Sequence, residues 1–218
     1  MRRSSFLLRL TNLCFLAMLV AALPLATSCK KNEEEPAKQS ASKVPLNPYT
    51  TDSIYSQVKQ QLEKNPDDVS ALYHLADLYD RNSQYVQAIE TYRKVLKLKP
   101  DMGYAYIKIG TAYSRLDKPE DAVKAFKDAE KLMPDYPVLY NNMGVAYGKM
   151  NKYREEVRAL QKAVRLRPRY STARFNLGVT FMKMGKRKEA LNEYKELKKF
   201  DEGVADALMK EIQGNTGT

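Results

Sequence analysis

Residues 103–136 read GYAYIKIGTAYSRLDKPEDAVKAFKDAEKLMPDY, and the order of small and large side chains in this stretch indicates how the chain folds. In its first half, large and small apolar residues recur three and four positions apart, the spacing of one helix face. These residues are Tyr106, Ile109, Gly110 and Tyr113. The second half carries another such face and then a proline, which cannot continue a helix. The stretch therefore predicts two helices joined by the short turn LDKPE.

The same arrangement recurs along the chain every 34 residues. Prolines at 66, 100, 134 and 168 mark the interval, which indicates a stack of similar units. The interval aligns a small-residue column (Ala76, Gly110, Gly144, Gly178), an alanine column (Ala88, Ala122, Glu156, Ala190) and a large-residue column (Tyr92, Phe126, Leu160, Tyr194). Small residues let two helices approach closely, and large ones fill the space beside the crossing. Four units are predicted within 69–202, namely 69–102, 103–136, 137–170 and 171–204.

These columns resemble those of the tetratricopeptide repeat family, in which an aromatic, Leu-Gly and Tyr in the first helix precede Ala, Phe and Pro in the second. The resemblance implies an all-α superhelix, or solenoid, of about four helical hairpins. Units at the ends of a stack need covers for their apolar faces. Apolar stripes predict an N-terminal capping helix at 51–66 and a C-terminal one at 203–213.

Three residues depart from the repeat pattern. Glu156 occupies the alanine column, Arg174 replaces the large aromatic of the first helix, and Glu202 replaces the closing proline. Burying Glu156 without a partner would be costly, so we expect it to reach the edge of the helix contact. We also expect the third and fourth units to pack less regularly.

The first 28 residues have the composition of an export signal: three arginines, an apolar run and then small residues. LATSC resembles a bacterial lipoprotein box, which would make Cys29 the lipidated N-terminus of the mature chain. Ordinary cleavage and an uncleaved membrane anchor are the alternatives. Acyl chains would hold the protein to a membrane. Residues 29–50 are polar and contain Pro and Ser, which predicts a flexible tether.

The whole chain carries a formal net charge of +11, which favours acidic protein segments, anionic lipid or anionic wall polymer as partners. The fifteen tyrosines could suggest base stacking, but most of them fall in the core columns, so we expect no nucleic acid. Relatives with Asp after the lipidated cysteine are often kept at the inner membrane. Because Lys30 stands there, we expect the periplasmic face of the outer membrane.

No motif for catalysis or cofactor binding occurs in the chain. His74 is the one histidine, and there is no glycine-rich phosphate loop, HExxH or GxSxG sequence. We therefore expect a protein that is not an enzyme, with no cofactor and no metal site. An enzyme using His74, Asp77 and Asp80 is the distant alternative.

The resemblance implies that the first helices line a concave groove for an extended peptide or a partner helix. Carried over position by position, the groove residues are Tyr73, Asp77, Tyr104, Lys108, Arg115, Asn141, Asn142, Val145, Lys149, Phe175, Asn176 and Lys183. Two columns stand out among them. The basic column (Arg81, Arg115, Lys149, Lys183) could stabilise helix ends or bind an acidic ligand.

The second column pairs Asn142 with Asn176, one unit apart, whereas Asn141 is interpreted as a local choice because apolar residues fill its place in the other units. Asparagine can pair with peptide amides and carbonyls through its donor and its acceptor. We therefore expect a membrane-anchored scaffold or adaptor that binds a protein or peptide partner. An assembly factor for a pilus or an outer-membrane machine, and a regulator of wall enzymes, are the alternative hypotheses.

Overall fold

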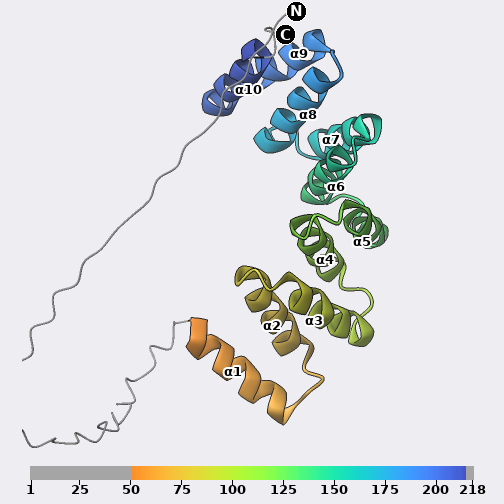
Figure 1. The fold of residues 1–218 in the computed structure, drawn as a ribbon, viewed down its shortest axis with the longest axis vertical. Helices are drawn as coiled ribbons and strands as arrows, with labels where there is room; N and C mark the ends of the chain where they lie inside the picture. Colours follow the sequence, from red (N-terminus) through yellow and green to blue (C-terminus); the bar gives the residue numbers. More distant parts are fainter. Residues whose placement is uncertain (1–50, 215–218) are drawn as a thin grey trace, which may run out of the picture. The chain divides into compact units, whose positions relative to one another are not determined.

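The computed structural model of the chain describes residues 51–214, and this part consists of ten α-helices without a β-strand (Figure 1). Their bounds are α1 (Thr51–Lys64), α2 (Val69–Arg81), α3 (Tyr85–Leu98), α4 (Gly103–Arg115), α5 (Pro119–Leu132), α6 (Pro137–Lys149), α7 (Tyr153–Leu166), α8 (Ser171–Lys183), α9 (Arg187–Lys198) and α10 (Glu202–Gly214). The predicted all-α fold of repeated helical hairpins is confirmed.

Several sequence predictions fall on other parts of the chain. The signal peptide (1–28), the lipidation site Cys29 and the tether (29–50) lie outside the described residues. The predicted capping segments 51–66 and 203–213 fall on α1 and α10. Across residues 51–214, no helix has the length and apolar character needed to span a membrane.

Hairpins are the unit of packing. Each first helix (α2, α4, α6, α8) packs most extensively against the helix that follows it, and each hairpin then packs on the next. First helices also meet one another, since α6 contacts both α4 and α8. At the ends, α1 packs on α2, whereas α10 packs on α8 and α9. The first helices therefore form one continuous face, which we call the first-helix face.

In every hairpin, the turn between the two helices contains one residue with a left-handed backbone conformation. Ser83, Asp117, Asn151 and Gly185 occupy the same place in their units and have φ of 60°, 56°, 56° and 71°. Glycine adopts this conformation without steric cost, and aspartate and asparagine adopt it more readily than most residues. The repeat therefore uses the same backbone turn in each unit, with a different side chain at its centre.

The small-residue column lets the helices of a hairpin touch. A Cβ built on Gly110 would lie 2.5 Å from a ring carbon of Phe126, and one on Gly144 would lie 2.8 Å from Leu160 Cγ. In the fourth unit the partner changes, because a Cβ on Gly178 would meet Leu208 of α10 at 2.6 Å. The C-terminal helix thus takes the place expected for Tyr194, and the last hairpin departs from the regular pattern.

Arg174 replaces the large aromatic residue of the first helix, and it is accommodated by an ion pair with Glu193. Its Nη1 lies 2.7 Å from Glu193 Oε2, and both side chains are largely buried. Arg174 Nε also donates to the carbonyl of Pro168 at 2.7 Å. In the preceding unit, the Tyr140 hydroxyl makes the equivalent bond to the carbonyl of Pro134 at 2.8 Å. Arginine therefore keeps the polar contact of the tyrosine, and Glu193 neutralises its charge.

The expectation for Glu156 was wrong. This side chain is only 5% exposed and does not reach the edge of the helix contact. Its Oε2 atom has no hydrogen-bond partner among the described residues. Burial raises the pKa of the Glu156 carboxyl, and the nearby Thr180 hydroxyl and the charge of Lys183 offset that rise only in part. The nearby glycine Gly148, which leaves space for the carboxylate, explains how a glutamate fits in this column.

Candidate functional site

The predicted groove residues lie on the first-helix face and gather in two places. Tyr73 and Tyr104 line a pocket of about 510 Å³ between α2 and α4. Val145, Lys149, Asn176 and Lys183 line a second pocket, of about 260 Å³, on α6, α7 and α8. The other predicted residues lie on the same helices, and several of them bond to each other.

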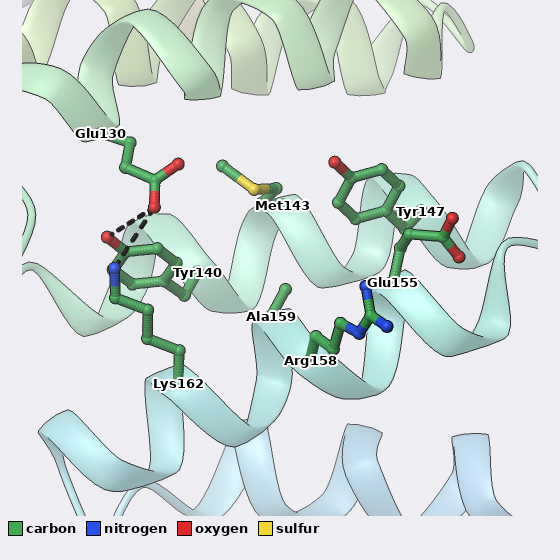
Figure 2. Close-up of a pocket in the computed structure, with 8 residues that line it drawn as sticks. All are labelled: Glu130, Tyr140, Met143, Tyr147, Glu155, Arg158, Ala159 and Lys162. Carbon is green, nitrogen blue, oxygen red and sulfur yellow. Dashed lines mark hydrogen bonds and ion pairs between the residues drawn. The ribbon is translucent and has the colours of Figure 1, made fainter.

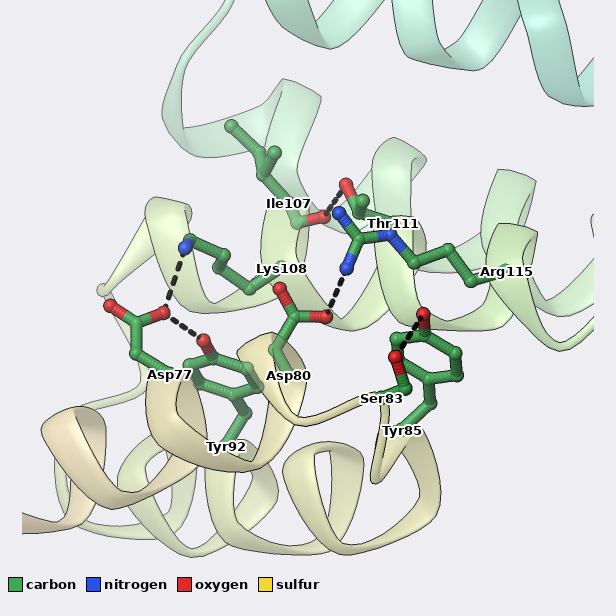
Figure 3. Close-up of polar contacts among 9 residues, drawn as sticks. All are labelled: Asp77, Asp80, Ser83, Tyr85, Tyr92, Ile107, Lys108, Thr111 and Arg115. Atoms are coloured by element: carbon green, nitrogen blue, oxygen red, sulfur yellow. Dashed lines mark hydrogen bonds and ion pairs between the residues drawn. The ribbon is translucent and has the colours of Figure 1, made fainter. Parts of the chain in front are cut away.

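At the N-terminal end, Asp77 is held by two groups (Figure 3). Lys108 Nζ of the next unit lies 2.7 Å from Asp77 Oδ1, and the hydroxyl of Tyr92 donates to the same oxygen. The pKa of the Tyr92 hydroxyl is raised mainly by burial and, second, by this bond to Asp77. Asp77 and Lys108 therefore join the first unit to the second, which leaves less of their charge for a ligand.

Arg115 makes a similar junction. Its Nη1 lies 3.0 Å from Asp80 Oδ1, and its guanidinium lies over the Tyr85 ring, 5.4 Å from the ring centre (Figure 3). Both partners belong to the preceding unit. Because Asp80 and Asp77 are both engaged in ion pairs, they are poorly suited to the catalytic roles that the enzyme hypothesis gave them. His74 is exposed on the same helix.

The basic column behaves differently at each step. Lys149 also reaches back one unit, to Asp117 Oδ1 at 2.9 Å and to the carbonyl of Ser114 at 2.8 Å. Lys183 lies over the Tyr153 ring at 5.9 Å, and within residues 51–214 neither it nor Arg81 has a carboxylate within ion-pair distance. Arg115 and Lys149 therefore join neighbouring units, a role that neither sequence hypothesis included. Of this column, only Arg81 and Lys183 keep their charge free of a carboxylate partner in the described residues.

An aromatic cluster surrounds the larger pocket. Tyr104 is 51% exposed and packs edge to face on Tyr136, with ring centres 5.5 Å apart. Tyr73 packs in the same way on Tyr92 at 5.4 Å. Burial, assisted by the negative charge of Asp77, raises the pKa of Tyr73 to about 12, so its hydroxyl stays protonated at neutral pH. Val69 and Met102 complete an apolar lining that suits an apolar or aromatic side chain.

The asparagines form a chain across two units. Asn176 Nδ2 of α8 donates to Asn141 Oδ1 of α6 at 3.0 Å, and Asn141 Nδ2 donates to Asn142 Oδ1 at 3.2 Å. Asn141 is 6% exposed, whereas its two partners are half-buried. The sequence interpretation of Asn141 as a local choice was therefore incomplete, because Asn141 is the link between the paired residues Asn142 and Asn176.

A further pocket, of about 250 Å³, was not expected from the sequence (Figure 2). It lies on α5, α6 and α7. Glu130 Oε1 lies 3.2 Å from Lys162 Nζ and 3.1 Å from the Tyr140 hydroxyl, and Lys162 lies over the Tyr140 ring at 4.1 Å. These polar groups pair with one another across the second and third units. The sequence signal that could have predicted this contact is that Lys162 follows Glu130 by 32 positions, which is close to the repeat interval.

Neither pocket of the first-helix face, as far as the structure describes it, holds a group of side chains that could bind a metal ion. In residues 51–214, no cluster of three or more His, Cys, Asp or Glu side chains could hold a metal ion. What the face offers is exposed aromatic and aliphatic side chains, amides and a few unpaired charges. Such a surface can bind another chain by contact and hydrogen bonding.

Comparison with known families and structures agrees with this geometry. Tetratricopeptide repeat models match residues 69–102, 103–136, 138–170 and 171–204. A search of the curated proteins gave no match. Tetratricopeptide repeat proteins bind other proteins, and their fold is typically that of a non-enzymatic scaffold.

Solved structures with the same fold include three that cover most of the chain. A MamA crystal structure has a TM-score of 0.65 and 23% identity, over 75% of this chain and 91% of that one. TTC0263, a thermophilic repeat protein from Thermus thermophilus, has a TM-score of 0.58 and 24% identity, over 76% and 90%. YrrB, described as having an unusual peptide-binding site, has a TM-score of 0.60 and 19% identity, over 74% and 93%. These likenesses concern the fold, and the family matches cover most of the chain: the protein belongs to the tetratricopeptide repeat family.

Proposed function

We propose that this protein is an adaptor of the bacterial envelope that binds an extended segment or a helix of a partner protein on its first-helix face. The asparagine chain of α6 and α8 is the observation that carries the proposal. In its two internal bonds Asn141 both donates and accepts, whereas Asn142 only accepts and Asn176 only donates. Asn142 Nδ2 and Asn176 Oδ1 have no partner in the described residues, so a donor and an acceptor are left for a peptide backbone.

The surroundings of the asparagines support binding of a whole segment. Val145 is 39% exposed beside them, and the aromatic pocket of Tyr73 and Tyr104 lies further along the same face. An extended chain gains main-chain hydrogen bonds and side-chain pockets together. YrrB, whose fold is similar, is described as having a peptide-binding site. Peptide binding is therefore the mode that this face suits best.

Membrane attachment through Cys29 is the second part of the proposal. The signal-like residues 1–28 and the LATSC sequence support lipidation, and Lys30 supports the periplasmic face of the outer membrane. Radiolabelled palmitate should enter the wild-type chain but not Cys29→Ser. Equal labelling of the two chains would contradict the lipid assignment. Membrane fractionation of the same cells would test the location.

Binding is tested with a variant that removes the asparagine chain without leaving a buried amide unpaired. Asn141→Ile, combined with Asn142→Ala and Asn176→Ala, places at position 141 the residue that Ile107 supplies in the second unit. Crosslinking in cells followed by mass spectrometry should identify a partner of the wild type, and the triple variant should lose it. Asn192→Ala, on an exposed part of α9, is the matched control. Unchanged recovery of the partner by a folded triple variant would refute the proposed site.

A further inference from the structure

Glu156 lines the pocket of about 260 Å³ on α6, α7 and α8, and one of its carboxylate oxygens is unpaired. No described residue donates a hydrogen bond to its Oε2, although the side chain is only 5% exposed. A buried acceptor without a partner destabilises the fold. The other three units have alanine here, at 88, 122 and 190. Among the four units, the third alone therefore carries this destabilising group, and it carries it in a pocket.

Gly148, which also departs from the repeat pattern, leaves space for the Glu156 side chain. A Cβ built on Gly148 would lie 2.7 Å from Glu156 Oε1 and 2.8 Å from Oε2. The other units have Asp80, Ser114 and Met182 at the place of Gly148. With any of those side chains at position 148, the Glu156 carboxylate would have to move from its present place. Glycine and glutamate thus occur together in the third unit, where the carboxylate occupies the space that a side chain at position 148 would need.

The remaining lining gives the pocket its chemical character. Lys149 and Lys183 contribute positive charge, and Lys149 is already bonded to Asp117. Lys183 has no carboxylate partner in the described part of the chain, and its charge acts on Glu156. Val145 and Val179 supply apolar contact, and Asn176 supplies an amide. A fitting group must therefore offer a donor to Glu156 and an acceptor to a lysine, on an apolar stem.

Side-chain classes can be compared on these terms. A basic group would be attracted by Glu156 but repelled by Lys149 and Lys183, and an acidic group would place a second carboxylate beside Glu156. An apolar group would leave Glu156 Oε2 unpaired. A carboxamide offers N–H donors and a carbonyl acceptor together without a charge. Of these classes, only the last satisfies both sides of the pocket.

We propose that the pocket formed by Val145, Gly148, Glu156, Val179 and Lys183 binds the carboxamide of a glutamine or asparagine side chain of the partner protein. The amide N–H donates to Glu156 Oε2, the carbonyl accepts from Lys183 Nζ, and the methylene carbons pack against the two valines. This specificity rests on the proposed function, because it places one side chain of the bound segment. Its chemistry can nevertheless be tested without the partner.

The test uses four probes that differ only in one side chain. The N-acetyl N-methylamides of glutamine, glutamate, lysine and leucine are titrated into the ¹⁵N-labelled full chain at pH 7. The backbone amide signals of Gly148 and Val179 report on the pocket. The glutamine probe should shift them saturably, with an affinity about tenfold higher than the other three, because it alone offers both a donor to Glu156 and an uncharged acceptor to Lys183. Equal affinities, or no saturable shift with any probe, would overturn the proposal and leave Glu156 hydrated by solvent only.

Two variants separate Glu156 from its surroundings. Glu156→Ala restores the alanine of the other units and should reduce the affinity for the glutamine probe to that for leucine. Glu155→Ala, at the exposed neighbouring carboxylate, should keep the preference. A preference that survives in Glu156→Ala would overturn the proposal. If the glutamine preference holds but crosslinking finds no partner, the proposed function fails alone; if a partner is found and the probes bind alike, the pocket assignment fails alone.

Discussion

Asn176 of α8 donates a hydrogen bond of 3.0 Å to Asn141 of α6, and so joins the first helices of two neighbouring units. Asn141 is buried, and its place is apolar in the other units, at Tyr73, Ile107 and Phe175. A buried amide is tolerated only when it is hydrogen-bonded. The asparagine chain therefore contributes to the packing of α6 on α8 as well as presenting polar groups on the surface.

Removal of Asn176 alone should destabilise the protein. In Asn176→Ala the buried Asn141 Oδ1 loses its donor, which should lower the free energy of unfolding by about 1–3 kcal/mol. Adding Asn141→Ile should recover most of the loss, because it removes the unpaired amide. Urea unfolding followed by circular dichroism measures both effects. Equal stability of wild type and Asn176→Ala would show that the Asn141–Asn176 bond is not formed in solution.

The Arg174–Glu193 pair should be strongly coupled. Glu193→Ala leaves a largely buried arginine without its partner, and breaking such pairs typically costs about 3–5 kcal/mol. Arg174→Tyr with Glu193→Ala recreates the Tyr140 and Ala159 arrangement of the third unit and should be close to wild type in stability. A double-mutant cycle in urea gives the coupling free energy. Additive effects of the two substitutions would contradict the structural account of this departure.

Glu156 should make stability depend on pH. Its pKa is raised in the folded chain above the ordinary value of 4.5, so the folded state keeps a proton that the unfolded state releases. Between those two pKa values stability falls as the pH rises, because the folded state binds more protons. Lys149 and Lys183 are the basic residues that line the same pocket.

Glu156→Gln removes this dependence and is the variant to compare. It should be more stable than the wild type at pH 7, by an amount on the order of 1 kcal/mol, or about 2–4 °C in Tm for a chain of this size. The difference should shrink as the pH falls to 4. Glu155→Gln, at an exposed site, should show little of this behaviour. A constant difference between pH 4 and 7 would mean that Glu156 titrates normally.

The helical hairpins could be predicted from the sequence because the 34-residue interval fixes which residues face the core. Gly110 against Phe126 follows from two columns and the packing of small residues on large ones. The position of Glu156 could not be predicted in the same way, because its place in the alanine column predicts a buried side chain whereas its charge predicts an exposed one. The result depends on Gly148, a neighbour on another helix whose role is visible only in three dimensions.

The polar contacts of the candidate site were predicted less well than the core. The columns identified Arg115 and Lys149, but the acceptor of each depends on side-chain conformation and on the preceding unit. Arg115 meets Asp80 and Tyr85, whereas Lys149 meets Asp117 at the turn. The second unit has Ser114 at the place of Asp80 and Pro119 at the place of Tyr85, so it offers neither of those partners. From their position at helix ends, these basic residues were expected either to stabilise the helix dipole or to bind an acidic ligand. Neither hypothesis required a contact between units.

Site-specific photocrosslinking in cells tests directly whether a partner protein binds on the first-helix face. A photoreactive residue at position 142 lies in the asparagine chain, and one at Arg158 lies on α7 beside the pocket of Figure 2, so it serves as the control. Binding on the first-helix face predicts a discrete adduct with one partner protein from position 142, absent from position 158. Adducts of the same pattern and yield from both positions, or a discrete adduct from position 158 alone, would contradict it.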